Sequence, residues 1–125
     1  MSKTVLIVDD CLTTRKLVGL CLKKMGYLLL QAENGLDALE KLARGPVDLV
    51  ITDMNMPQMD GVALTSSLKQ DQTLQGIPVL MLSSESAEKE RESGLAAGAD
   101  AYLTKPVSQE RLEQEVKKLL AVSTS

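Results

Sequence analysis

The chain alternates short, continuous apolar runs with longer segments in which apolar residues recur at helical spacing. The apolar runs are not interrupted by polar residues at every second position. This pattern is typical of strands that are buried on both faces of a parallel sheet. Strands are therefore predicted at residues 5–8, 28–30, 49–51 and 79–82, with a weaker fifth strand at 101–103.

Apolar stripes between these runs predict helices that pack one side against the sheet. The stripes are Thr14, Leu17, Val18, Cys21 and Met25 in the first helix; Leu36, Leu39 and Leu42 in the second; Leu64 and Leu68 in the third; and Leu112, Val116 and Leu119 in the last. Helix ends are predicted at Gly26 and Gly45, and N-caps at Asn34, Asp60 and Ser108. The segment 84–98 has the weakest helical pattern, because it is polar and contains Gly94.

Strands and helices that alternate five times imply right-handed crossovers, and hence an α/β fold with a five-stranded parallel sheet and helices on both faces. The 125 residues suit one domain, predicted to span 1–125, with a substantial core. In open sheets of this kind, ligands bind at the carboxyl ends of the strands. Candidate site residues are therefore expected there.

Composition narrows the classes of function. The net charge of −3 gives no electrostatic reason to expect nucleic-acid binding, which normally depends on a basic patch. The apolar runs are much shorter than the ~20 residues of a membrane span, and the N-terminus lacks an export signal, so a cytoplasmic protein is predicted. The chain has no His, which excludes Ser-His and Cys-His catalysis. Cys11 and Cys21 would lie about 15 Å apart along a helix, too far for a disulfide, so both are expected to be reduced.

Polar side chains follow four of the predicted strands. Asp9 and Asp10 follow the first strand, Asp53 the third, Ser83 the fourth and Lys105 the fifth. Each has a simpler interpretation: an aspartate or a serine can cap the following helix, and Lys105 can be a solvated surface lysine. Their joint occurrence at one edge of the sheet favours a functional site.

Three neighbouring carboxylates must either bind protons more tightly or hold a cation. Oxygen ligands without His or Cys favour Mg²⁺ over zinc or copper. A carboxylate beside Mg²⁺, a lysine and a hydroxyl is suited to accept a phosphoryl group, since an ionised aspartate is already a nucleophile.

Four segments carry a family resemblance: VLIVDD (5–10), DLVITDMNMPQMDG (48–61), PVLMLSSE (78–85) and YLTKP (102–106). In this order and spacing they resemble the receiver domain of response regulators in two-component systems, of the CheY-like chemotaxis type. The resemblance implies a flavodoxin-like strand order of 2-1-3-4-5. It also implies a phosphorylation-activated switch of a phosphorelay, which is not an enzyme acting on external substrates.

The resemblance further implies roles for individual residues. Asp53 would be the phosphoacceptor. Asp10, Asp53 and the backbone carbonyl of Asn55 would bind Mg²⁺ directly, and Asp9 would reach it through water. Ser83 and Lys105 would contact the phosphoryl group, and Ser83 and Tyr102 would form the switch. Asn55 and Glu85 would influence dephosphorylation.

Partners follow from the same resemblance. A sensor histidine kinase or a phosphotransfer protein would supply the phosphoryl group. An output protein would bind by contact at the face formed by the helical segment 84–98, the fifth predicted strand (101–103) and the last predicted helix. The candidate outputs are a flagellar motor, a phosphorelay and a type IV pilus system. We expect a monomer that neither binds nucleic acid nor inserts into a membrane. Formation of a dimer on phosphorylation is left open as an alternative.

Two other classes remain at this stage. A phosphatase of the haloacid dehalogenase kind also uses an aspartate nucleophile with Mg²⁺, but it expects Asp-x-Asp after the first strand and a cap. A flavodoxin-like FMN binder expects a hydroxyl- and Gly-rich loop where this chain has Asp9 and Asp10. Turnover of phosphate esters would favour the first class, and a yellow colour the second.

Overall fold

Five parallel strands form one sheet in the computed structural model, which describes residues 3–54, 56, 59–83, 92, 95–105 and 107–123. The strands are β1 (Thr4–Val8), β2 (Leu28–Ala32), β3 (Leu49–Asp53), β4 (Val79–Ser83) and β5 (Ala101–Thr104). Their order is β2-β1-β3-β4-β5, with every neighbouring pair parallel. The predicted fold class and strand order are confirmed.

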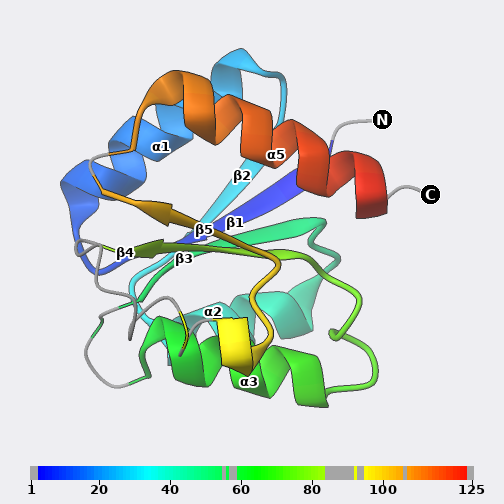
Figure 1. Cartoon of the computed structure of the whole chain (residues 1–125). Helices are drawn as coiled ribbons and strands as arrows, with labels where there is room; N and C mark the ends of the chain where they lie inside the picture. Colours follow the sequence, from blue (N-terminus) through cyan, green and yellow to red (C-terminus); the bar gives the residue numbers. More distant parts are fainter. Residues whose placement is uncertain are drawn as a thin grey trace.

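Helices cover both faces of the sheet (Figure 1). One face carries α1 (Leu12–Lys24) and α5 (Gln109–Ser123), and the other carries α2 (Gly35–Arg44) and α3 (Gly61–Gln70). Alternate residues of β1 enter the two cores: Val5 and Ile7 pack towards α1 and α5, and Leu6 and Val8 towards α2 and α3. The continuous apolar runs in the sequence are therefore explained by burial on both sides.

Side-chain caps begin three helices where the sequence predicts them. Asn34 Oδ1 accepts a hydrogen bond from the Asp37 amide at 2.9 Å, and Asp60 Oδ1 accepts from the Ala63 amide at 2.8 Å. Ser108 Oγ accepts from the Arg111 amide at 3.2 Å. Gly26 follows α1 with φ +89°, a conformation that favours glycine. Of the helix predicted at 84–98, most residues lie outside those described, and 95–97 are helical.

Three details of the predicted burial are wrong. β2 is an edge strand with one neighbour, and its Leu28 and Leu30 are exposed rather than buried on both faces. In α1, Leu17 is 65% exposed, because Val18, Cys21 and Leu22 are the residues that face the sheet. The second helix likewise turns Leu36 to solvent and packs Ala38 and Leu42 inwards. Apolar spacing alone did not reveal which side of these elements meets the sheet.

The length and the apolar character of each helix decide whether it could span a membrane. None of the helices in the part of the chain that the structure describes is both long enough and apolar enough to cross a bilayer.

Candidate functional site

Three carboxylates meet at the carboxyl edge of the sheet. Asp9 and Asp10 follow β1, and Asp53 is the last residue of β3, the strand paired with β1. One carboxylate oxygen from each of the three lies within 4.8 Å of the others. Asp9 and Asp53 are buried and Asp10 is exposed, so the cluster opens to solvent on the side of Asp10. Such an oxygen set could hold a hard metal ion.

Lys105 closes another side of this acidic cluster. Its Nζ lies 3.0 Å from Asp9 Oδ2 and 3.4 Å from Asp53 Oδ1. Its amide donates to the carbonyl of Ser83, which extends the pairing of β5 with β4 beyond Thr104. Burial by itself would lower the pKa of Lys105, but the hydrogen bond to Asp9 and the negative charges of Asp53 and Asp9 outweigh it and raise the pKa above its ordinary value. The ammonium is thus charged at neutral pH and faces two carboxylates.

Asp9 is fixed by contacts on both carboxylate oxygens. Oδ1 accepts from the Cys11 amide at 2.8 Å, and Oδ2 contacts Lys105. The N-cap residue of α1 is Cys11, whose own side chain makes no capping bond. The Asp9 carboxylate therefore both stabilises the turn before α1 and belongs to the acidic cluster. Asp10, in contrast, is exposed to solvent.

The backbone around Asp53 is closely packed. The Met54 amide donates to the Leu82 carbonyl at 2.8 Å, and the Gly61 amide donates to the Met54 carbonyl at 3.0 Å. A Cβ atom on Gly61 would lie 2.2 Å from the Asp53 carbonyl oxygen, so only glycine fits there. Sequence reasoning treated Gly61 only as a helix start; its place beside the Asp53 backbone depends on how α3 packs against the end of β3.

Arg15 is a second residue that sequence reasoning missed at this site. From the first turns of α1, its guanidinium donates to the Asp9 carbonyl and to Gln31 Oε1 on β2. Its position on the same helix side as Gln31 depends on how α1 crosses β2, which no local motif reveals. Arg15 thereby connects the acidic cluster to the edge of the sheet.

The remaining predicted site residues are distributed around this cluster. Ser83 is fully buried at the end of β4, next to β3, where Leu82 pairs with Asp53. Tyr102 is half-buried in β5 and packs against a small cluster that contains Met54 and Met81. Asn55 and Glu85 lie outside the described residues.

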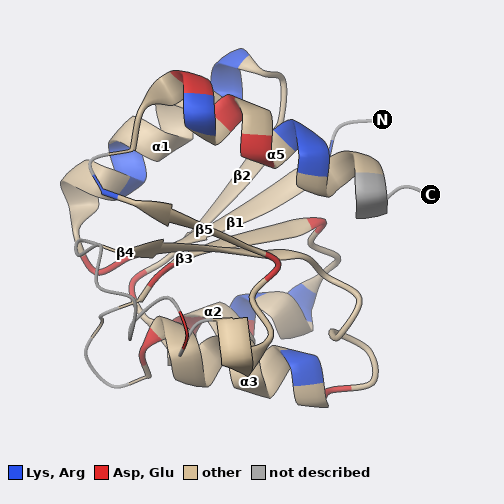
Figure 2. Ribbon diagram, viewed as in Figure 1, with Lys and Arg blue, Asp and Glu red and all other residues tan. Residues whose placement is uncertain are grey.

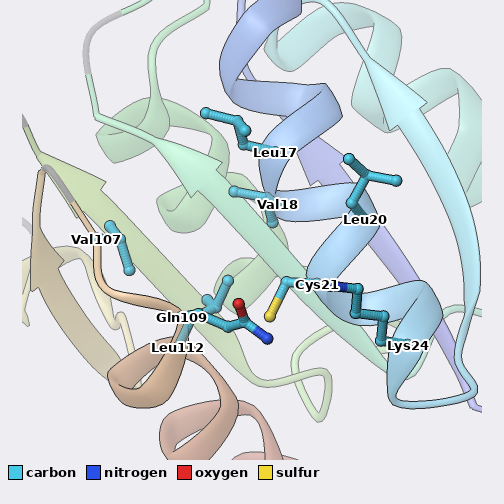
Figure 3. Close-up of a pocket in the computed structure, with 8 residues that line it drawn as sticks. All are labelled: Leu17, Val18, Leu20, Cys21, Lys24, Val107, Gln109 and Leu112. Atoms are coloured by element: carbon cyan, nitrogen blue, oxygen red, sulfur yellow. The ribbon is translucent and has the colours of Figure 1, made fainter.

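A groove of about 310 Å³ lies beside the site, between α1 and α5 (Figure 3). Its walls include Leu17 and Cys21 from α1 and Val107 and Leu112 from the region of α5. Val107 stands two residues after Lys105, so the groove begins close to the acidic cluster. It offers apolar surface next to the place where chemistry would occur.

Comparison with known proteins identifies the family of this fold and site. Residues 5–117 match the response regulator receiver domain. The chain belongs to that family. This result favours a receiver domain of two-component signalling over the phosphatase and flavin-binding alternatives.

Individual relatives agree with this assignment. The receiver domain is 36% identical over 116 residues to the chemotaxis protein CheY-3 of Vibrio cholerae, covering 92% of this chain and 89% of that protein. It is also 36% identical over 116 residues to the sensor histidine kinase CheAY of Helicobacter pylori, covering 91% of this chain and 14% of that longer protein. A response regulator of Chloroflexus aurantiacus superposes with a TM-score of 0.94 at 33% identity, covering 97% of this chain and 99% of the other. The fold and the family are therefore those of CheY-like receivers.

Proposed function

We propose that this receiver domain is a switch that accepts a phosphoryl group on Asp53 from a phosphohistidine of a sensor kinase or phosphotransfer protein. One observation carries the proposal: three carboxylates and a charged lysine converge at the carboxyl edge of the sheet in a chain of this family. Asp53 is the member that ends β3, the strand between β1 and β4, and its Oδ1 lies 3.4 Å from Lys105 Nζ, which also contacts Asp9.

Mg²⁺ is the proposed cofactor, with Asp10, Asp53 and the carbonyl of Asn55 as direct ligands. Asp9 would then reach the ion through water. This division is supported by the contacts of the two adjacent aspartates, because both oxygens of Asp9 are already engaged while Asp10 is exposed. When bound, the ion would neutralise charge on the phosphoryl oxygens.

The proposed transfer needs no separate base. A carboxylate oxygen of Asp53 attacks phosphorus, the new O–P bond forms as the N–P bond to the donor imidazole breaks, and the electron pair stays on that nitrogen. Lys105 Nζ, already 3.4 Å from Asp53 Oδ1, would hold one phosphoryl oxygen. The hydroxyl of Ser83, on the neighbouring strand, would donate to another. The donor protein would contact the groove between α1 and α5, which lies beside this rim.

The proposed switch runs from Asp53 to β5. Phosphorylation would draw Ser83 towards the site and change the environment of Tyr102, shifting an equilibrium between two arrangements. Support comes from Met54, which follows the acceptor directly and belongs to the cluster against which Tyr102 packs. The face formed by the helix predicted at 84–98, β5 and α5 would then bind an output protein, and the 36% identity to CheY-3 favours a chemotaxis-like output.

The proposal also covers the domain organisation, the cellular location and the oligomeric state of the protein. Residues 1–125 would form a single receiver domain that assists only its own phosphorylation and dephosphorylation. It would act in the cytoplasm as a monomer, without binding nucleic acid. A flagellar motor, a phosphorelay and a type IV pilus system remain the candidate outputs.

The proposal is tested by incubating the protein with Mg²⁺ and acetyl phosphate and measuring intact mass. Wild-type protein should gain one phosphoryl group, and Asp53→Asn should gain none. Asp71→Asn is the matched control, because Asp71 is exposed at the end of α3, and it should be modified like wild type. Equal modification of the Asp53→Asn variant would refute the assignment. Phosphotransfer from a phosphorylated histidine kinase then tests the physiological donor.

A further inference from the structure

Exposed apolar side chains lie on both faces of the sheet along its β2 edge. Leu20 of α1 is 59% exposed on one face, and Leu28 and Leu30 of β2 are 58% and 37% exposed on the other. Figure 3 shows Leu20 projecting from α1 away from Val107. A groove of about 200 Å³ separates α1 from β2; Gly19, Leu20 and Leu29 line it together with Arg15, Lys16 and Lys23. This β2-edge groove lies on the other side of Leu20 from the groove between α1 and α5, and Leu20 lines both.

The backbone of β2 offers hydrogen-bonding groups along the same edge. The Leu28 amide donates to the Lys3 carbonyl, and the Ala32 carbonyl accepts from the Asp9 amide. Because backbone groups alternate along a strand, those of residues 28, 30 and 32 face β1 and those of Leu29 and Gln31 face outwards. Lys41 covers the carbonyl of Gln31. The backbone amide and carbonyl of Leu29 and the backbone amide of Gln31 thus lie at the outer edge of β2, where a further strand can be added.

The positive charge of α1 indicates which kind of chain can bind at the outer edge of β2. α1 carries Arg15, Lys16, Lys23 and Lys24 and no acidic residue (Figure 2). A second copy of this chain, paired edge to edge through β2, would bring two such basic helices together, and like charges across an interface oppose binding. An acidic segment has the complementary charge.

We propose that the outer edge of β2 binds an extended segment of a partner protein in which acidic and apolar residues alternate. The alternation follows from the two sides of the sheet. Side chains of an added strand point in turn to either face. On the α1 side they meet Lys16 and Lys23, which suit carboxylates. On the opposite side they meet Leu28 and Leu30, which share the face of the buried Ala32 and suit apolar groups.

This surface extends beyond the phosphoryl chemistry and does not depend on it. It touches the acidic cluster only through Arg15, which contacts both the Asp9 carbonyl and Gln31. Arg15 is therefore left unchanged in the test, and Lys16 and Lys23 are varied instead, since both are exposed.

The test uses a blocked hexapeptide of alternating Val and Glu, titrated into the ¹⁵N-labelled full chain and followed by NMR. Saturable shifts should centre on the amides of Leu29 and Gln31 and on Lys16, Gly19 and Lys23, which line the β2-edge groove but not the groove between α1 and α5. The double variant Lys16→Glu, Lys23→Glu should weaken binding at least about tenfold, because losing two ion pairs of about 0.7 kcal/mol each accounts for tenfold and the new carboxylates also repel the peptide. The matched control Lys117→Glu, Lys118→Glu changes two exposed lysines of α5 and should bind within about twofold of wild type.

Two further peptides separate strand addition from charge attraction alone. The same hexapeptide with alternate backbone nitrogens methylated keeps its charge but cannot pair with β2, and it should lose the shifts at Leu29 and Gln31. A Val and Lys hexapeptide should not bind. Equal binding of the methylated peptide would overturn the proposal.

Other results would also overturn it. One is a set of shifts that centres on the groove between α1 and α5. Another is self-association of the wild-type chain through β2 in sedimentation. The third is a failure of the peptide to bind while vesicles of anionic phospholipid bind the wild type and not the Lys16→Glu, Lys23→Glu variant. The titration is repeated with Asp53→Asn, which should bind the peptide as wild type does. Failure of Asp53 phosphorylation would leave this outcome unchanged, so the two proposals are tested independently.

Discussion

Replacing Gly61 by alanine should directly disturb the end of β3, where Asp53 lies. The added Cβ would lie 2.2 Å from the Asp53 carbonyl oxygen, and 3.0 Å from both the carbonyl carbon of Asp53 and the Cα of Met54. All three atoms belong to the backbone, so no side-chain rotation relieves the overlap. The segment is also held by the hydrogen bonds from Met54 to Leu82 and from Gly61 to Met54.

The magnitude follows from how far the chain must move. A contact of 2.2 Å has to open by about 1 Å to reach ordinary van der Waals separation, and overpacking of this kind costs about 1–3 kcal/mol. At this chain length 1 kcal/mol corresponds to about 3–6 °C in Tm, so we expect Tm to fall by about 3–18 °C. The shift should also move the Asp53 carboxylate and slow its phosphorylation.

Thermal unfolding followed by circular dichroism measures the loss, and acetyl phosphate labelling measures the effect on Asp53. The matched control is Gly76→Ala, because a Cβ at Gly76 meets nothing within 4 Å and φ is not in the left-handed region. That variant should unfold within about 1 kcal/mol of wild type, on the stabilising side if anything. If Gly61→Ala and Gly76→Ala melt alike, the inferred close approach to Asp53 is wrong.

Three other predictions concern the site and its surroundings. Asp10→Asn should weaken Mg²⁺ binding more than Asp9→Asn in a calorimetric titration, because both oxygens of Asp9 are engaged; the reverse order would exchange their proposed roles. Lys105→Met should tighten Mg²⁺ binding, since a cation 3.4 Å from the Asp53 carboxylate is removed, yet slow labelling of Asp53; weaker Mg²⁺ binding would contradict this. The amide of Glu33 lowers the pKa of Asp37 below its usual 3.8, with a smaller contribution from Lys41, so this carboxylate stabilises the fold above pH 3.8 and loses its contribution as the pH falls through the lowered pKa. Asp37→Asn should therefore melt below wild type at pH 7 but not at pH 2, and a difference that persists at pH 2 would argue against the assignment.

Much of the candidate site could be predicted from sequence because the residues stand at strand ends. Once the apolar runs are recognised as parallel strands, their carboxyl ends must share one edge of the sheet. Asp9, Asp53 and Lys105 are therefore expected together although 96 residues separate the first from the last. The same reasoning did not distinguish Asp9 from Asp10 by geometry, since adjacent residues at a turn leave the strand in different directions.

Local chemistry determined the elements themselves. Strand runs and the caps at Asn34, Asp60 and Ser108 depend on groups within a few residues, so the sequence alone predicts them. Only the tertiary structure decided that the leucines of β2 are exposed, that Gly61 approaches the Asp53 carbonyl, and that Arg15 reaches Asp9 and Gln31. The physical reason is that burial and close contact depend on which neighbour each surface meets, and that neighbour is brought by a distant part of the chain.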